Sequence, residues 1–542
     1  MTDPDKTWDL WVQPWIQAVL EDGTVELLSV HDVFLRAPEI REIVGDIPTQ
    51  AFAIQRLLLA ILHAAVDGPQ DRLHWEDLWN DGPPMDQVTV YEELWRGRFD
   101  LFSESTPFFQ VAGLHTSKDE FSGLEKLVAD VPAGHPFFTT RIGAGLDRLT
   151  FAEAARWLVH LQAYDISGIK SGAVGDPRVK GGKGYPLGTG WAGAIGGVLV
   201  EGDNLWQTLL LNLIPRGEAM LATFGAADRP AWEASPSTVA EADDLASRPY
   251  GPLDLYTWQS RRVRLRRDGD AVTGIVVANG DKITPQNRQR LEPMTSWRRS
   301  VPQQKALKQP IVYMPRQHDP SRALWRGLAQ VLPAVAPRGK ADEGQDNVTA
   351  GVFEWAVIAQ GRTARVRLHA FGMKYGTQNA IVDDVFDDRL TFSVALLAHS
   401  DEGLPRLVVD AVEATDQGVA ALRNLASNLV RAAGGSDDAL ADSARRAAAE
   451  RAYSALDGPF RSWLQALEPG ADLVSARYVW NAEARRIVKR LGRELVEGAG
   501  PAAWIGREVR GRRVTTPEAD GWFQTALREA LPDVQRPEET HS

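Results

Sequence analysis

The spacing of apolar residues mixes helical and strand-like stretches over the first 400 residues of the chain. Residues 51–65, AFAIQRLLLAILHAA, are apolar nearly all round, which predicts a helix buried in a core. Residues 1–35 predict a short β-hairpin, and residues 261–278 predict a second hairpin that turns at Asp268–Asp270. Residues 352–370 alternate between apolar and polar positions, and this predicts two further strands. We therefore expect these residues to form a mixed α/β domain.

From about residue 404 the pattern becomes helical and remains so. Four segments with helical spacing are separated by breaks that contain glycine, namely 404–433, 437–467, 472–496 and 516–531. Four helices in series with short connections predict a helical bundle. The expected fold class is α+β, with a large mixed α/β N-terminal domain over residues 1–400 and a C-terminal four-helix bundle over residues 401–542.

Composition excludes several classes of function. The 542 residues include no cysteine, which rules out disulfides, thiolate metal ligands and cysteine catalysis. No apolar run is long enough to span a membrane and the N-terminus has no signal-peptide pattern, so we expect a cytoplasmic protein without a membrane partner. The patterns HExxH and GxSxG are absent, and we expect no catalytic residue, metal or cofactor. The formal net charge is −12, so any nucleic-acid binding must depend on local basic patches.

The most unusual stretch is residues 168–197, GIKSGAVGDPRVKGGKGYPLGTGWAGAIGG. Glycine allows positive φ and close approach of another backbone, and Lys180 and Lys183 add positive charge. Exposed amides with interspersed cations suit a phosphate or a nucleic-acid groove, while a flexible surface loop is the alternative. Residues 188–193 match the dinucleotide pattern GxGxxG, but no apolar strand precedes them. A nucleotide-binding enzyme that uses residues 168–197 is therefore the less favoured alternative.

Three arginines alternate along the predicted strand that begins at residue 261. Arg262, Arg264 and Arg266 share one face, opposite the apolar side chains of the strand. A strand face whose charges are all positive is unusual in an acidic protein. It indicates either contact with RNA or a phosphate backbone, or structural ion pairs within the protein. The predicted hairpin is followed by Asn279–Lys282, which predicts a second tight turn with Lys282 at its tip.

Two further segments carry side chains suited to nucleic acid. A polar turn at residues 372–379 lies between predicted strands, and its Gln378 and Asn379 are residue types that read base edges. Such residues more often only solvate a turn. Phe137 and Phe138 lie in a loop beside an arginine, where they either stack on bases or anchor the loop to the core.

The order of several stretches resembles the CasA family, the large subunit of the type I-E CRISPR Cascade surveillance complex. The resemblance covers nearly the whole chain, and its specificity comes from the order of the stretches. The matching pieces are Trp15-Ile16, Arg56–His63, Phe99–Phe102 followed by Pro107–Val111, the glycine stretch, Gly202–Asn212, and Gly372–Ile381 before the terminal helices.

The resemblance implies a non-catalytic subunit of an RNA-guided antiviral complex that recognises the protospacer-adjacent motif in duplex DNA from the minor groove. It implies four partners: other Cascade protein subunits, the CRISPR guide RNA, double-stranded target DNA and a recruited helicase-nuclease. It places the glycine loop on Gly181, Gly182 and Gly184, the motif-reading lysine on Lys282, a duplex-opening wedge on Thr377, Gln378 and Asn379, and an aromatic loop on Phe137 and Phe138. Some relatives carry cysteines that look like zinc ligands, and this chain has none, so we expect no zinc.

Overall fold

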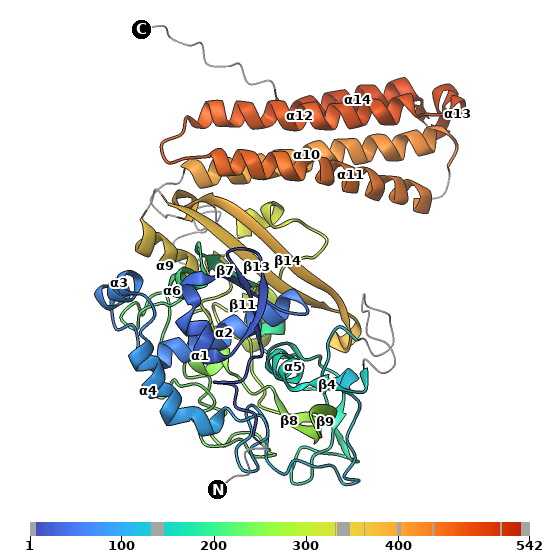
Figure 1. Ribbon diagram of the computed structural model, residues 1–542. Helices are drawn as coiled ribbons and strands as arrows, with labels where there is room; N and C mark the ends of the chain where they lie inside the picture. Colours follow the sequence, from blue (N-terminus) through green and yellow to red (C-terminus); the bar gives the residue numbers. More distant parts are fainter. Residues whose placement is uncertain are drawn as a thin grey trace. The chain divides into compact units, whose positions relative to one another are not determined.

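The computed structural model describes residues 7–131, 146–330, 332, 347–361, 364–397, 403–435, 438–509 and 512–532. The chain divides into two compact units (Figure 1). The first comprises residues 1–322, 337–359 and 366–389, and the second comprises residues 323–336, 360–365 and 390–542. The domain division at residue 400 that the sequence predicts stays a prediction.

The first unit begins with a small sheet. Strands β1 (Ile16–Leu20) and β2 (Val25–Leu28) form the predicted N-terminal hairpin, which confirms that expectation, and β3 (Ile40–Val44) pairs with the other edge of β1. Helix α1 (Val30–Leu35) connects β2 to β3 and is capped by Ser29. Trp11 and Trp15, which precede β1, are fully buried, and the centre of the Trp11 ring lies 5.2 Å from that of Phe99.

The centre of the first unit is helix α2 (Pro48–Ala65), whose residues 49–63 are all buried, as its uniformly apolar pattern predicts. Helix α5 (Phe151–Tyr164) packs against α2, and it starts at a capping box in which Thr150 and Glu153 satisfy each other's backbone N–H groups. The shorter helices of this unit are α3 (Arg72–Asp81), α4 (Met85–Trp95), α6 (Leu205–Leu211), α7 (Pro252–Tyr256), α8 (Val301–Leu307) and α9 (Gly351–Gln360).

Two three-stranded sheets carry the segments of functional interest. One has the order β4-β9-β8, with β4 (Leu149–Thr150), β8 (Arg261–Asp268) and β9 (Ala271–Asn279), and it confirms the predicted second hairpin. The other has the order β14-β13-β7, with β7 (Gly197–Glu201), β13 (Arg365–Tyr375) and β14 (Val382–Ser393). Three short strands, β10 (Trp297–Arg299), β11 (Tyr313–Pro315) and β12 (Asn347–Val348), form another sheet.

The prediction of two strands over residues 352–370 is wrong in its first half. Residues 351–360 form helix α9, and only the residues from Arg365 onward are a strand. Val352, Phe353, Trp355 and Ala356 are buried, and such a short apolar run fits a buried helix as well as a buried strand. Periodicity alone cannot separate the two structures here.

The second unit is dominated by long helices. Helix α10 (Gly403–Ala432) packs against α11 (Asp438–Ala466), α12 (Leu473–Glu497) and α14 (Thr516–Ala530), which confirms the predicted C-terminal four-helix bundle. Between α12 and α14 lie helix α13 (Pro501–Ile505) and the hairpin of β15 (Arg507–Val509) and β16 (Arg512–Val514). Trp480 is buried in the bundle and donates a hydrogen bond of 2.9 Å to the Thr415 hydroxyl. Among the described residues, no helix is long and apolar enough to cross a membrane.

Candidate nucleic-acid interface

The glycine stretch folds back on itself in a two-residue turn. Strands β5 (Lys170–Ser171) and β6 (Lys183–Gly184) pair antiparallel, and the backbone groups of Lys180 and Lys183 exchange hydrogen bonds of 3.1 and 3.2 Å. Gly181 and Gly182, between them, have φ of +58° and +72°. Two consecutive positive φ angles are the mark of a type I′ turn, which favours glycine at both positions. We call Lys180–Lys183 the glycine turn, and all four of its residues are exposed.

The base of the glycine turn is fastened to the end of strand β9. Gly184 is buried, and a Cβ atom on it would come within 2.9 Å of the Asn279 side-chain nitrogen. That nitrogen donates a hydrogen bond of 2.7 Å to the backbone oxygen of Tyr185. Arg178 donates to the backbone oxygens of Asn279 and Gly280 at 3.0 and 2.8 Å. The stretch is therefore attached at its base, and the turn itself is presented to the outside.

Lys282 lies close in sequence to this attachment. It is exposed, and it follows Asp281, a buried residue whose carboxylate accepts hydrogen bonds from Arg248 and Arg262. The predicted hairpin tip is wrong, because the chain continues from residue 280 to 296 without a strand. The structure thus places Lys282 three residues beyond Asn279, the residue that holds the glycine turn.

The predicted wedge forms the connection between β13 and β14, which are neighbours in their sheet. Thr377–Asn379, here called the wedge turn, is a tight turn with all three residues exposed. Gln378 and Asn379 both have positive φ, at 56° and 55°. The backbone oxygen of Ile381 accepts a hydrogen bond of 3.0 Å from the N–H of Gly376, which closes the turn.

The wedge turn and the glycine stretch meet at the C-terminal end of helix α5. The backbone oxygen of Asn379 accepts a hydrogen bond of 2.7 Å from the N–H of Ser167, just before the glycine stretch begins. The hydroxyl of Tyr375, at the end of β13, donates to the backbone oxygen of Tyr164 at 2.6 Å. The wedge turn and the end of β13 are therefore hydrogen-bonded to residues 164–167, and the glycine stretch continues directly from these residues.

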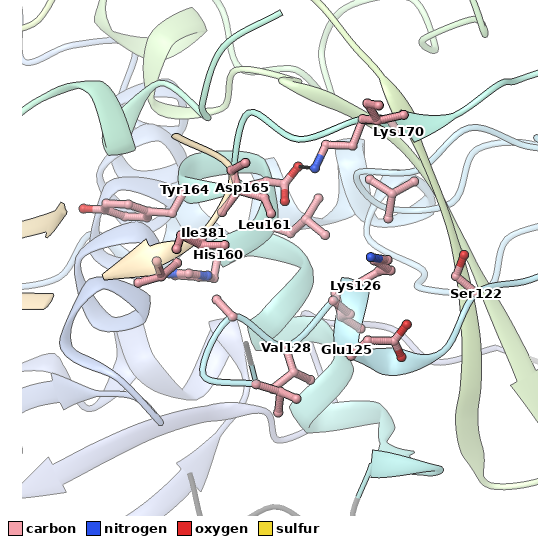
Figure 2. A pocket seen from close by; sticks show the side chains of 18 of the residues that line it. Ser122, Glu125, Lys126, Val128, His160, Leu161, Tyr164, Asp165, Lys170 and Ile381 are labelled. Carbon is pink, nitrogen blue, oxygen red and sulfur yellow. Dashed lines mark ion pairs between the residues drawn. The ribbon is translucent and has the colours of Figure 1, made fainter. Parts of the chain in front are cut away.

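A buried charge cluster holds this junction together. The Asp165 carboxylate pairs with Lys170 of β5 at 2.5 Å (Figure 2). It also pairs with Arg261 of β8. Arg261 also donates to the backbone oxygens of Ile166 and Gly188, each at 2.8 Å. We call Asp165, Lys170 and Arg261 the anchor cluster. Its three side chains are at most 10% exposed, so removing one charge leaves the others buried and unbalanced.

The electrostatics of the anchor cluster follow from burial and mutual attraction. Burial disfavours the ionised carboxylate of Asp165, but the charges of Lys170 and Arg261 outweigh burial and hold the pKa of Asp165 below its ordinary value. For Lys170, burial is the largest influence, and it lowers the pKa despite the attraction of Asp165. Sequence reasoning missed this cluster, because its members lie on three segments separated by up to 96 residues.

The three predicted arginines of β8 have different environments. Arg262 is 1% exposed, and its guanidinium is occupied by Asp281 at 2.6 Å and by backbone oxygens of Thr238 and Ala240. The structure does not support Arg262 as a phosphate contact and matches the ion-pair alternative. Arg264 is half-buried and Arg266 is exposed, and their guanidinium carbons lie 5.5 and 5.6 Å from the ring centre of Phe121.

The sequence also raised an aromatic loop, a metal site and a dinucleotide site. Phe137 and Phe138 lie outside the described residues. In the part of the chain that the structure describes, no group of three or more histidines or carboxylates is placed to hold a metal ion. Residues 188–193 are followed by strand β7, the reverse of the strand-then-helix context that a dinucleotide pattern requires.

Comparison with known proteins gives a consistent result. The family model described as CRISPR-associated protein Cse1 matches residues 9–491. A protein of Thermus thermophilus described as CRISPR-associated protein CasA/Cse1 is 27% identical over 521 residues, covering 91% of this chain and 90% of that protein. The chain is also similar to the crystal structure of Thermobifida fusca Cse1, with 46% identity, a TM-score of 0.90 and coverage of 98% of this chain and 100% of that one.

Two further structures extend the similarity. Acidimicrobium ferrooxidans Cse1 is 30% identical, with a TM-score of 0.83 and coverage of 98% of this chain and 99% of that chain. A chain of a structure described as a CRISPR RNA-guided surveillance complex has the same fold at 20% identity, with a TM-score of 0.65 and coverage of 90% and 99%.

Proposed function

Because the chain belongs to the Cse1 family of CRISPR-associated proteins, we propose that it is the large subunit of a Cascade surveillance complex. In this role it is not an enzyme. It binds other Cascade subunits and the guide RNA, recognises the protospacer-adjacent motif in double-stranded DNA, helps to open the duplex, and provides a docking surface for a helicase-nuclease. The fold shared with a chain of an RNA-guided surveillance complex supports the assembly.

The backbone of the wedge turn carries the proposal for duplex opening. Gln378 and Asn379 hold consecutive left-handed conformations on an exposed turn. A left-handed conformation costs a non-glycine residue roughly 1–2 kcal/mol, and such strain concentrates at functional sites. The hydrogen bond from Ser167 fixes this turn on the backbone just beyond helix α5, so the two side chains project from a supported position. Inserting side chains between base steps costs a few kcal/mol of stacking, which a supported turn can withstand.

The glycine turn and Lys282 supply motif recognition in this account. The minor groove distinguishes base pairs by a degenerate pattern, so a closely approaching backbone and one lysine are sufficient to test a short motif. Gly181 and Gly182 have no side chains to keep DNA away, and nothing lies within 4 Å of the position of a Cβ atom on either residue. Lys180 and Lys183 flank them as exposed cations. Guide-RNA pairing then reads the remaining sequence.

A titration with the reconstituted complex tests the function. Motif-bearing duplex DNA should bind tightly and compete with labelled duplex, whereas mononucleotides should not compete. Competition by mononucleotides would favour the alternative, a nucleotide-binding enzyme that uses residues 168–197.

Lys282→Ala tests the motif reader within the same titration. It should reduce discrimination between correct and incorrect motifs by about 1–3 kcal/mol. Lys305→Ala, which removes an exposed lysine of helix α8, is the matched control and should leave discrimination unchanged. If Lys282→Ala weakens binding equally for every motif, the lysine is only a phosphate contact.

A further inference from the structure

A cavity of about 120 Å³ in the first unit is lined in part by residues 380–382, which directly follow the wedge turn. Its walls come from four segments, namely residues 122–131, residues 160–171, Val277 and residues 380–382. The last segment follows the wedge turn without a break, and the second contains the Asp165–Lys170 ion pair (Figure 2). The cavity therefore adjoins the segment that follows the wedge turn and the start of the glycine stretch.

The dimensions of the cavity fit a single aromatic ring. A dry apolar protein cavity of roughly 150 Å³ is known to take up benzene, so about 120 Å³ belongs to the same size class. Leu127, Val128 and Leu161 are buried apolar residues in the wall. His160 and Tyr164 add stacked rings whose centres are 5.0 Å apart. A flat apolar ligand would find extensive contact with this surface.

The cavity also carries polar groups near its apolar walls. The ammonium group of Lys170 has three N–H donors. In the described part of the chain, its one ion-pair partner is Asp165. The Lys170 side chain is 8% exposed, so its remaining donors lie in a confined space. Glu125 and Lys126 are exposed wall residues and place both signs of charge at the cavity. A ring with carbonyl oxygens matches this combination better than a purely apolar one.

We propose that this cavity captures one unpaired nucleobase with a carbonyl oxygen, taken from the DNA beside the motif when the wedge turn opens the duplex. The proposal rests on the proposed function and deepens it. A base that leaves the duplex loses its stacking and pairing, and a pocket that receives it offsets part of that cost. Lys170 donates to the carbonyl oxygen, as lysine does to guanine O6 in direct readout. Capture at this position slows reannealing behind the wedge turn.

The first test uses the reconstituted complex and DNA already melted beside the motif. Abasic nucleotides are introduced one at a time on both strands of the melted segment. One position should weaken binding about tenfold in the wild type, the scale of lost base stacking. Val128→Phe, which fills the cavity, should make binding insensitive to that abasic site. Val239→Phe, which narrows a separate cavity of about 420 Å³, is the matched control and should preserve the sensitivity.

The outcomes separate this proposal from the proposed function. If no position is sensitive, or if Val128→Phe keeps the sensitivity, base capture is wrong while motif recognition can still be intact. If Val128→Phe impairs assembly of the complex before DNA is added, the occupant is a partner protein's side chain and base capture is again wrong. Loss of motif discrimination in the wild type would overturn the proposed function itself.

A second test needs only the folded chain, and it remains decisive if Val128→Phe folds poorly. Saturation-transfer NMR with thymidine should show contact to the base, and Lys170→Met should weaken that signal. Deoxyadenosine, whose base lacks a carbonyl oxygen, should give a weaker signal than thymidine. Equal signals from both nucleosides, or a signal that Lys170→Met leaves unchanged, would contradict the assigned ligand chemistry.

Discussion

The glycine turn and the wedge turn are both exposed turns, and both contain two consecutive residues with positive φ. In the glycine turn these residues are Gly181 and Gly182, and in the wedge turn they are Gln378 and Asn379. Glycine adopts positive φ without steric cost, whereas asparagine tolerates it moderately and glutamine poorly. One turn therefore presents bare backbone, and the other presents two amide side chains at a conformational cost.

We propose that the glycine turn docks on DNA and that the wedge turn opens the duplex. Backbone without side chains suits close approach to a groove, and amide side chains suit insertion between bases. The wedge turn is attached just beyond helix α5 through Ser167, and the start of the glycine stretch, which carries the glycine turn, is attached there through the anchor cluster. Docking and opening can therefore be separated by substitutions in one turn or the other, whereas a change in their shared support affects both.

The largest effect is expected from removing that support. Asp165→Ala leaves Lys170 and Arg261 buried without their shared carboxylate, which costs about 3–5 kcal/mol for a broken buried pair. Denaturant unfolding should show this loss, and the complex should lose both motif docking and duplex opening. Asp243→Ala, at an exposed position, is the control and should change neither. If docking survives while opening is lost, the two turns do not share this support.

Acid should weaken the fold at His160 of helix α5, the helix that leads into the anchor cluster. Burial lowers the pKa of His160 to about 3, against the opposing attraction of Asp165, while the unfolded chain has the ordinary value of 6.5. Below pH 6.5 the unfolded chain therefore binds a proton that the folded chain does not, and stability falls as the pH falls toward 3. The contribution of His160 to the free energy of unfolding should be about 2 kcal/mol smaller at pH 5 than at pH 7.

The measurement compares wild type with His160→Gln at both pH values, because buried His63 and His318 contribute in the same direction to both proteins. Between pH 7 and pH 5, the free energy of unfolding of the variant should fall by about 2 kcal/mol less than that of the wild type. Equal losses in the two proteins would show that His160 is not the group that titrates.

A substitution in the glycine turn should separate the effect of backbone strain on stability from the effect on DNA binding. Gly182→Val forces a β-branched residue into positive φ and should cost roughly 1–2 kcal/mol of stability. Gly269→Val introduces the same strain at the β8–β9 turn, where φ is +60° and nothing lies near a Cβ atom. Both variants should unfold at similar denaturant concentrations, but only Gly182→Val should weaken binding to motif-bearing duplex. Equal binding by both would assign the glycine turn a structural role alone.

The smallest effects are expected at the basic strand face. Arg264→Gln and Arg266→Gln should each make the slope of log affinity against log salt shallower by about one unit, with equal weakening for all motifs. Arg72→Gln, at an exposed ion pair on helix α3, is the control for a change of one charge. An unchanged slope in the double variant would assign this face to the fold or to a protein partner.

Some of this architecture could be predicted from the sequence, and the limits have physical causes. Helices α10, α11, α12 and α14 begin and end within about two residues of the predicted segments, because long helical spacing broken by glycine has few other interpretations. Helix α9 was predicted as strand because buried helices and strands look alike over ten residues.

The interface shows the same limits at the level of single residues. Strand alternation placed Arg262 and Arg264 correctly along β8. The burial of Arg262, however, depends on contacts with Asp281 and with residues 238–240, and strand periodicity cannot predict such contacts. The positive φ of Gln378 could not be predicted from the sequence, because glutamine does not favour positive φ. In the anchor cluster, Asp165 and Lys170 lie close together in the sequence, but Arg261 is 96 residues from Asp165, and no local pattern reports that contact.

The most direct test converts the wedge turn into a second glycine turn with Gln378→Gly and Asn379→Gly. Glycine keeps the positive φ angles, so the account predicts unchanged or higher stability and normal docking on motif-bearing duplex. Opening of intact duplex should slow by about 100-fold, equivalent to about 2.7 kcal/mol, while DNA melted beforehand should restore the wild-type rate. If the double-glycine variant opens intact duplex at the wild-type rate, the side chains of the wedge turn do not open DNA and the central claim is wrong.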